Sequence, residues 1–178
     1  VLPLALVYAR KYPNNKYYQN ERLKELSEAA IRYMIKSSHP DGTCDDYFPY
    51  ERAMGALVFS LYAASEAYLV IGMRDEKVED LFIKRVRHLE HENESGRLSN
   101  HQALAGLAAY NVYCITGDTK ARKSAEDRVR YAKYGGLLYT KVMIFQISIG
   151  SLDYTPSLDC DGPTALEMSV GQFDGVYK

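Results

Sequence analysis

The sequence predicts an all-α fold built from helical hairpins, and three observations lead to this prediction. Helical periodicity recurs through residues 1–136 of the 178-residue chain. Charged amphipathic helices alternate with helices that carry almost no charge, and two junctions about 45 residues apart look alike. A helix that is apolar all round is buried on every side, whereas an amphipathic helix keeps one face in water. The alternation therefore predicts an inner and an outer layer, either closed into an α/α toroid or left open as a partial helical-hairpin ring.

The first half of the chain supplies one helix of each kind after a short opening helix. The opening helix is predicted over Leu2–Ala9. Asn20 can cap the next helix, which is charged and amphipathic and runs to about Lys36. A helix follows over about 49–71, beginning at Pro49, and its first half carries no charge after Arg52. Gly72 then suits the position just past a helix end.

The second half repeats the same order. A charged amphipathic helix is expected over 75–92, a charge-free alanine-rich helix over 99–116, and a third charged helix over 118–134. Gly117 stands at the second junction as Gly72 stands at the first. Two junctions of the same kind indicate a repeated hairpin.

The C-terminal segment, 137–178, breaks the pattern. Residues 137–149 can be read as a strand from their β-branched content or as a helix from their apolar stripe. Residues 151–178 contain scattered Pro and Gly and predict no regular element. The chain is therefore divided into a helical-hairpin domain, 1–136, and an irregular C-terminal segment, 137–178, of uncertain structure.

The composition narrows the classes of partner. Lys and Arg number 22 against 23 Asp and Glu, so no net charge attracts nucleic acid or an anionic membrane. No apolar run reaches the length of a membrane span. The three cysteines are widely spaced and no His lies at metal-ligand spacing, so neither a metal site nor a cofactor is predicted; reduced thiols slightly favour a cytoplasmic protein without fixing the compartment. The 16 tyrosines suit either sugar-binding clefts or helix packing near water.

A candidate site is expected where the inner helices begin. Inner helices that run parallel gather their N-terminal ends at one rim, and helix N-termini favour anionic groups. The loops 39–50, 94–100 and 134–137 would meet there. The candidate site residues that fall on this rim are Asp45, Asp46, Tyr47, Tyr50, Glu51, Arg52, Asn100, His101, Gln102 and Tyr134.

Two chemistries can be drawn from this set. Two of the carboxylates Asp41, Asp45, Asp46 and Glu51 could act as acid and base in glycoside hydrolysis, if they lie roughly 5 to 9.5 Å apart. Their alternative role is structural, because Asp-Gly with nearby carboxylates is common in turns and helix caps.

The second chemistry is β-elimination on a uronate-containing chain. Asn100 and His101 would neutralise the uronate carboxyl group, and Tyr47, Tyr50 or Tyr134 would take the α-proton and protonate the leaving oxygen. Here too a structural role is open, since Asn at a helix start is an ordinary N-cap.

The chain also resembles a known family. Its strongest element is the string Asp-Gly-x-x-Asp-x-Tyr-x-Pro-x-Glu over residues 41–51, and the segments 5–18, 61–67 and 98–103 extend the similarity. Over roughly residues 1–136 the chain resembles the α/α-toroid part of heparinase II/III-like proteins. The resemblance implies a polysaccharide lyase that acts on uronate chains with an Asn/His pair, here Asn100 and His101, and a tyrosine. It does not assign the tyrosine, for which Tyr47 stands as the candidate.

A non-catalytic reading remains open beside the enzymatic one. Three hairpins do not close a ring, and lyases of this type carry a larger toroid and a β-sandwich. The chain is then a helical-repeat module that binds a polysaccharide, an oligosaccharide or a protein. In either case we expect a homodimer or a partner that covers the exposed inner helices.

Overall fold

The protein is all-helical over the part of the chain that the structure, a computed structural model, describes, namely residues 1–91 and 99–135. This confirms the predicted all-α class. The expectations for 92–98 and for 137–178 fall outside the described residues. The helices are α1 (Leu2–Ala9), α2 (Glu21–Ser37), α3 (Met54–Val70), α4 (Glu76–His91), α5 (Ser99–Thr116) and α6 (Thr119–Gly135).

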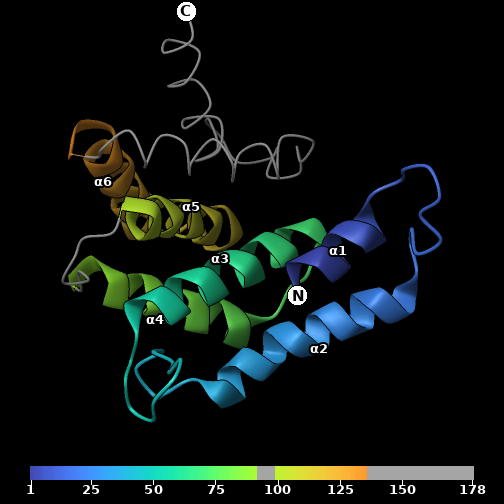
Figure 1. The fold of residues 1–178 in the computed structure, drawn as a ribbon, viewed down its shortest axis with the longest axis horizontal. Coiled ribbons are helices and arrows are strands. Elements are labelled where there is room, and N and C mark those ends of the chain that lie inside the picture. The colour runs from blue at the N-terminus through green and yellow to red at the C-terminus, as the bar shows by residue number, and fades with distance from the viewer. Residues whose placement is uncertain (92–98, 136–178) are drawn as a thin grey trace, which may run out of the picture.

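The helices form two layers (Figure 1). α3 lies between α1 and α5 in one layer, and α4 lies between α2 and α6 in the other. The hairpins α1–α2, α3–α4 and α5–α6 join the layers. This is the arrangement expected from alternating apolar and amphipathic helices.

Helices of the same layer run in the same direction. Phe59 of α3 meets His101 of α5, and farther along both helices Glu66 of α3 meets Asn111 of α5. Because residue numbers rise together along the two helices, their N-terminal ends lie at the same end of the molecule, as Figure 1 also shows.

The core lies between the inner helices and beneath the outer ones. Small side chains on α5 let α3 approach closely, and larger aliphatic side chains on α3 fill the space. The buried residues of this contact include Leu57, Val58, Leu61 and Ala64 of α3 and Ala105, Ala108, Ala109 and Val112 of α5.

The outer helices share one capping device. Asn20, Asp75 and Asp118 each accept a hydrogen bond from the backbone N–H two residues on, at 3.0, 3.2 and 3.0 Å respectively. Each cap provides a hydrogen-bond acceptor for one of the backbone N–H groups that lack a partner at a helix start.

The junctions before α4 and α6 also match. Gly72 and Gly117 have φ of 64° and 73°, a conformation in which other residues are strained. The structure therefore agrees with the hairpin repeat that the two similar junctions predicted.

The start of α3 corrects the prediction. The helix was expected from Pro49, but it begins at Met54. Tyr50 and Arg52 have φ of 63° and 52°, which an α-helix does not contain. The residues before Met54 instead form a closed loop, described below.

The structure bears on the membrane question in one respect. Within residues 1–91 and 99–135, the helices are too short or too polar to cross a lipid bilayer.

Candidate functional site

The segment between α2 and α3 ends in a compact loop, residues 45–52, which we call the aromatic loop. Asp45 closes it at one end. One carboxylate oxygen of Asp45 accepts from the Tyr50 N–H at 2.9 Å, and the other accepts from the Arg52 N–H at 3.1 Å. The same carboxylate contacts His39 Nε2 at 2.9 Å. Asp45 thus ties both the start and the end of the loop together.

Glu51 holds the aromatic loop from the other end. Its Oε2 atom accepts from the N–H groups of Asp46, Tyr47 and Phe48 at 3.3, 2.9 and 3.4 Å. Consecutive N–H groups that point at one anion form a nest, and here a side chain of the loop fills it.

Asp41 steadies the turn that leads into the loop. It accepts from the N–H and the hydroxyl of Thr43 at 3.0 and 2.6 Å and forms an ion pair with Arg52. Gly42, with φ of 89°, packs against Arg85 of α4, and a Cβ atom there would lie 3.1 Å from the Lys84 Cβ atom. The turn is therefore fixed to the helical layers.

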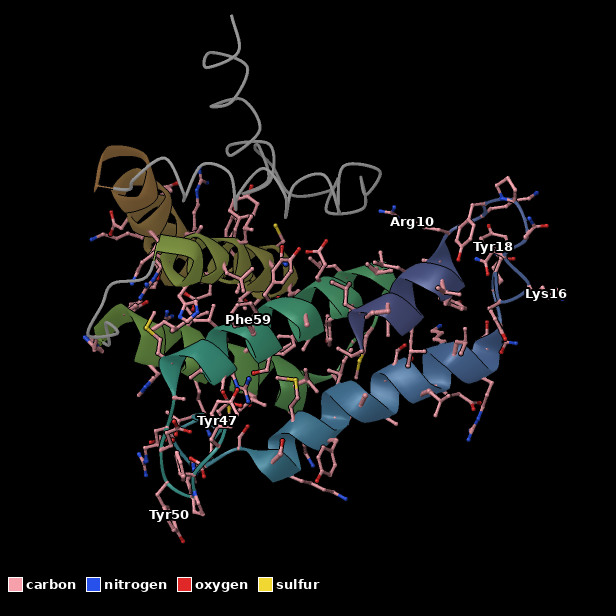
Figure 2. All side chains as sticks on the ribbon, in the orientation of Figure 1. Arg10, Lys16, Tyr18, Tyr47, Tyr50 and Phe59 are labelled. Carbon is pink, nitrogen blue, oxygen red and sulfur yellow. The ribbon has the colours of Figure 1, made fainter. Side chains whose placement is uncertain are left out.

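The rings of the aromatic loop face solvent. Tyr47, Phe48 and Tyr50 are 82%, 70% and 79% exposed. The Tyr50 ring stacks on His39 at a centroid distance of 5.8 Å, and Figure 2 shows Tyr50 projecting away from the helices. Three exposed rings within four residues of one loop make the aromatic loop a candidate contact surface.

The electrostatics of the loop carboxyls oppose a general-acid role. The Thr43 hydroxyl lowers the pKa of Asp41, and the His39 contact, with two backbone N–H groups, lowers the pKa of Asp45 to about 2. The Tyr47 N–H, with its neighbours, lowers the pKa of Glu51. A general acid in glycoside hydrolysis needs a raised pKa so that it holds a proton at neutral pH. Asp45 and Glu51 instead hold the backbone of the aromatic loop, and Asp41 holds Thr43 and Arg52.

The predicted site residues separate into two groups. Asp45, Asp46, Tyr47, Tyr50, Glu51 and Arg52 all lie in the aromatic loop. His101 lies at the start of α5, where its ring meets the Phe59 ring edge-on at 5.4 Å. No hydrogen bond or ring contact between the described parts of the chain joins Tyr47 to His101.

The remaining predicted residues do not add to the loop. Gln102 is buried and accepts a hydrogen bond from Arg128 of α6, so it belongs to the packing between α5 and α6. The side chains of Asn100 and Tyr134 lie outside the part of the chain that the structure describes. In the described ranges there is no group of three His, Cys, Asp or Glu side chains placed to hold a metal ion.

A buried polar cluster was not predicted as a site feature. Glu66 of α3 accepts from Asn111 Nδ2 of α5 at 2.7 Å, and the same amide lies 3.4 Å from the Ser65 hydroxyl. Burial raises the pKa of Glu66, against the effects of Asn111 and Arg10. In the sequence, Glu66 is the single charged residue of the segment that forms α3, and this feature could have indicated the cluster.

Comparisons with known proteins supply no assignment. No protein-family model matches the chain, and no curated protein or solved structure gives a significant match. The resemblance to heparinase II/III-like proteins therefore stays a prediction.

Proposed function

We propose that this protein is a non-catalytic binding module for carbohydrate and that the aromatic loop is its contact surface. The observation that carries the proposal is the contrast within residues 45–52. The carboxylates Asp45 and Glu51 turn inward to the backbone, while the rings of Tyr47, Phe48 and Tyr50 turn outward to solvent. Exposed tyrosines offer a flat apolar face and a hydroxyl, which suits a half-wet ligand such as a sugar.

The rigidity of the loop supports the same proposal. Five backbone N–H groups of the loop are held by two carboxylates, so the loop is ordered before a ligand arrives. Pre-ordering lowers the conformational entropy lost on binding. Positive φ at Tyr50 and Arg52 is backbone strain of the kind that gathers at ligand-binding positions.

The enzymatic alternative is β-elimination by Asn100, His101 and Tyr47, as the resemblance implies. One feature of the described structure supports β-elimination. Because α3 and α5 run parallel, their N-terminal ends lie at the same end of the molecule, where the rim site was expected. Against it, the His101 ring packs on Phe59, and Tyr47 has no described contact with His101. We therefore place binding first.

The proposal is tested by calorimetric titration of the protein with neutral, amino-sugar and uronate-containing oligosaccharides. We expect saturable binding to at least one class. The variants Tyr47→Ala and Tyr50→Ala should each weaken it by roughly tenfold, as expected for loss of an aromatic contact worth about 1 to 1.5 kcal/mol.

Tyr17→Ala is the matched control, because Tyr17 is an exposed tyrosine in a different loop. Equal loss of binding in all three variants, or no binding to any oligosaccharide, would overturn the proposal. Release of an unsaturated product, seen as ultraviolet absorbance and lost in His101→Ala, would instead establish the lyase.

A further inference from the structure

Arg85 of α4 is a buried positive charge with no carboxylate partner in the described part of the chain. It is 1% exposed, and its Nη1 and Nη2 atoms donate to the hydroxyls of Ser60 and Ser38 at 2.7 and 2.9 Å. Both partners are neutral, and the buried Nε atom has no hydrogen-bond partner among the described residues. Because a buried charge is costly unless an opposite charge offsets it, the surroundings of Arg85 favour an anionic group beside it.

The equivalent arginine of the next hairpin does have a carboxylate nearby. Arg128 of α6 is also buried and stands at the same distance from the N-cap of its helix as Arg85 does. Burial lowers the pKa of both arginines. The Glu90 carboxylate opposes this effect at Arg128, whereas the Cys44 sulfur opposes it at Arg85 through charge and hydrogen bonding. A thiol therefore has, at Arg85, the electrostatic role that a carboxylate has at Arg128.

Cys44 is positioned near this guanidinium by the segment that leads into the aromatic loop. Its Sγ atom lies 3.9 Å from the Oγ atom of Ser60, the hydroxyl that also accepts from Arg85. Gly42 packs on Arg85, where an added Cβ atom would lie 3.6 Å from the Arg85 Cγ atom. The thiol is free and half-buried, so it keeps access to solvent. In proteins, a positive charge beside a cysteine stabilises the thiolate, which is the reactive form.

We propose that Cys44 is an oxidation site, at which hydrogen peroxide or a small organic hydroperoxide converts the thiol to a sulfenic acid. Arg85 stabilises the sulfur while it carries negative charge. The oxidant is a small molecule, because the half-buried side chain of Cys44 also packs against the hydrophobic core. The site is separate from the exposed rings of the aromatic loop, and its chemistry does not depend on the proposed carbohydrate binding.

The peroxide alone balances the reaction. Cys44 loses its proton to solvent, and the thiolate attacks one oxygen of the peroxide. An S–O bond forms as the O–O bond breaks, so the sulfur is oxidised by two electrons and the peroxide is reduced. The leaving hydroxide or alkoxide takes up a proton and departs as water or an alcohol. The oxygen bound to Cys44 then adds an acceptor beside the guanidinium, whose Nε donor is unused in the described structure.

The rate of this oxidation is measured by adding hydrogen peroxide to the whole protein in the presence of dimedone, which labels sulfenic acid. Cleavage after Lys36 and Arg52 releases Cys44 in a peptide, residues 37–52, that contains no other cysteine, so mass spectrometry reports on this site alone. A synthetic peptide of the same residues is the reference, because it has the local sequence without Arg85. We expect Cys44 to react roughly tenfold faster in the folded protein than in the peptide.

Two substitutions of Arg85 separate the effect of its charge from the effect of the fold. Arg85→Met removes the charge and should lower the rate to that of the peptide or below, whereas Arg85→Lys keeps the charge and should restore most of the rate. Arg128→Met is the matched control, because it removes a buried arginine from the next hairpin and should leave the rate at Cys44 unchanged.

Far-ultraviolet circular dichroism checks that each variant is folded, and the comparison of the wild-type protein with the peptide needs no variant. A rate in the folded wild-type protein no faster than in the peptide would overturn the proposal. So would an unchanged rate in folded Arg85→Met, or an equal loss in Arg85→Met and Arg128→Met.

Discussion

At the scale of single residues, the carboxyl groups of this protein perform opposite tasks in two environments. Asp45 and Glu51 lie at the surface. The His39 contact and two backbone N–H groups lower the pKa of Asp45, and backbone N–H groups lower the pKa of Glu51. Glu66 is buried between helices, and burial raises its pKa. The loop carboxylates therefore support the backbone in their ionised form, whereas burial makes Glu66 hold its proton more tightly than an exposed glutamate does.

Removing Asp45 should loosen the aromatic loop without unfolding the protein. In Asp45→Ala, the amides of Tyr50 and Arg52 lose their acceptor, so their hydrogen exchange should become roughly tenfold faster while the midpoint of thermal unfolding changes little. Asp46→Ala, at an exposed neighbour, is the control. Because the pKa of Asp45 is lowered to about 2, its contribution is complete above the ordinary value of 3.8 and is lost as the pH falls through about 2. Unchanged exchange at both amides in Asp45→Ala would refute this role.

Glu66 should make the protein less stable as the pH rises. Its folded pKa lies above the ordinary value of 4.5, so the folded state holds the proton more tightly than the unfolded state. Its stabilising contribution is complete below pH 4.5 and is lost as the pH rises through the folded pKa. Glu66→Gln keeps an acceptor for Asn111. The free energy of unfolding of this variant, minus that of the wild type, should be larger at pH 7.5 than at pH 4. Urea denaturation at the two pH values measures this; an equal difference at both would contradict it.

At the scale of helices, the caps connect the hairpins to one another. Asp75 accepts from the N–H groups of Lys77 and Val78 at the start of α4 and also pairs with Arg32 of α2. One side chain thus stabilises a helix start and a contact between two outer helices.

Replacing this cap should have a measurable cost. Asp75→Ala should lower the free energy of unfolding by about 1 kcal/mol, since loss of an N-cap typically costs about 0.5 to 2 kcal/mol. Asp80→Ala, on the exposed face of the same helix, should change it by less than about 0.5 kcal/mol. Chemical denaturation measures both, and equal effects of the two substitutions would show that the cap is not the cause.

Sequence reasoning succeeded where periodicity over many residues decides the structure. Apart from the start of α3, the ends of the helices over the described ranges were expected to within a few residues, because alternation between apolar and amphipathic stretches is a long signal. The start of α3 was missed because Pro49 also suits a first helical turn. A helix does not begin at Pro49 because Asp45 accepts hydrogen bonds from the Tyr50 and Arg52 N–H groups. These hydrogen bonds form when the loop folds.

The candidate site was predicted only in part for a related reason. The sequence indicated that acidic and aromatic residues gather over 45–52, and the structure places them in one loop. It did not indicate which side chains point inward, because carboxylates and tyrosines in a loop can each face the backbone or the solvent. Gln102 was assigned to the rim from its place beside His101, yet helical geometry turns it into the packing with Arg128.

At the scale of the molecule, the aromatic loop stands apart from the two helical layers. The aromatic loop lies between α2 and α3 and presents rings on a fixed backbone. On α2, Leu26 and Ala30 are exposed, whereas Leu81 and Arg85 of α4 and Ser124 and Arg128 of α6, at the same distances from their caps, are buried. The aromatic loop suits a flat half-polar ligand.

The most direct test of the central claim is an NMR titration of tyrosine-labelled protein with the oligosaccharide classes used in calorimetry. The account predicts saturable shifts of the Tyr47 and Tyr50 ring signals, with the Tyr17 ring unchanged. If binding occurs but the shifts fall instead at His101 and Phe59, or if no tyrosine ring responds to any oligosaccharide, the aromatic loop is not the carbohydrate surface.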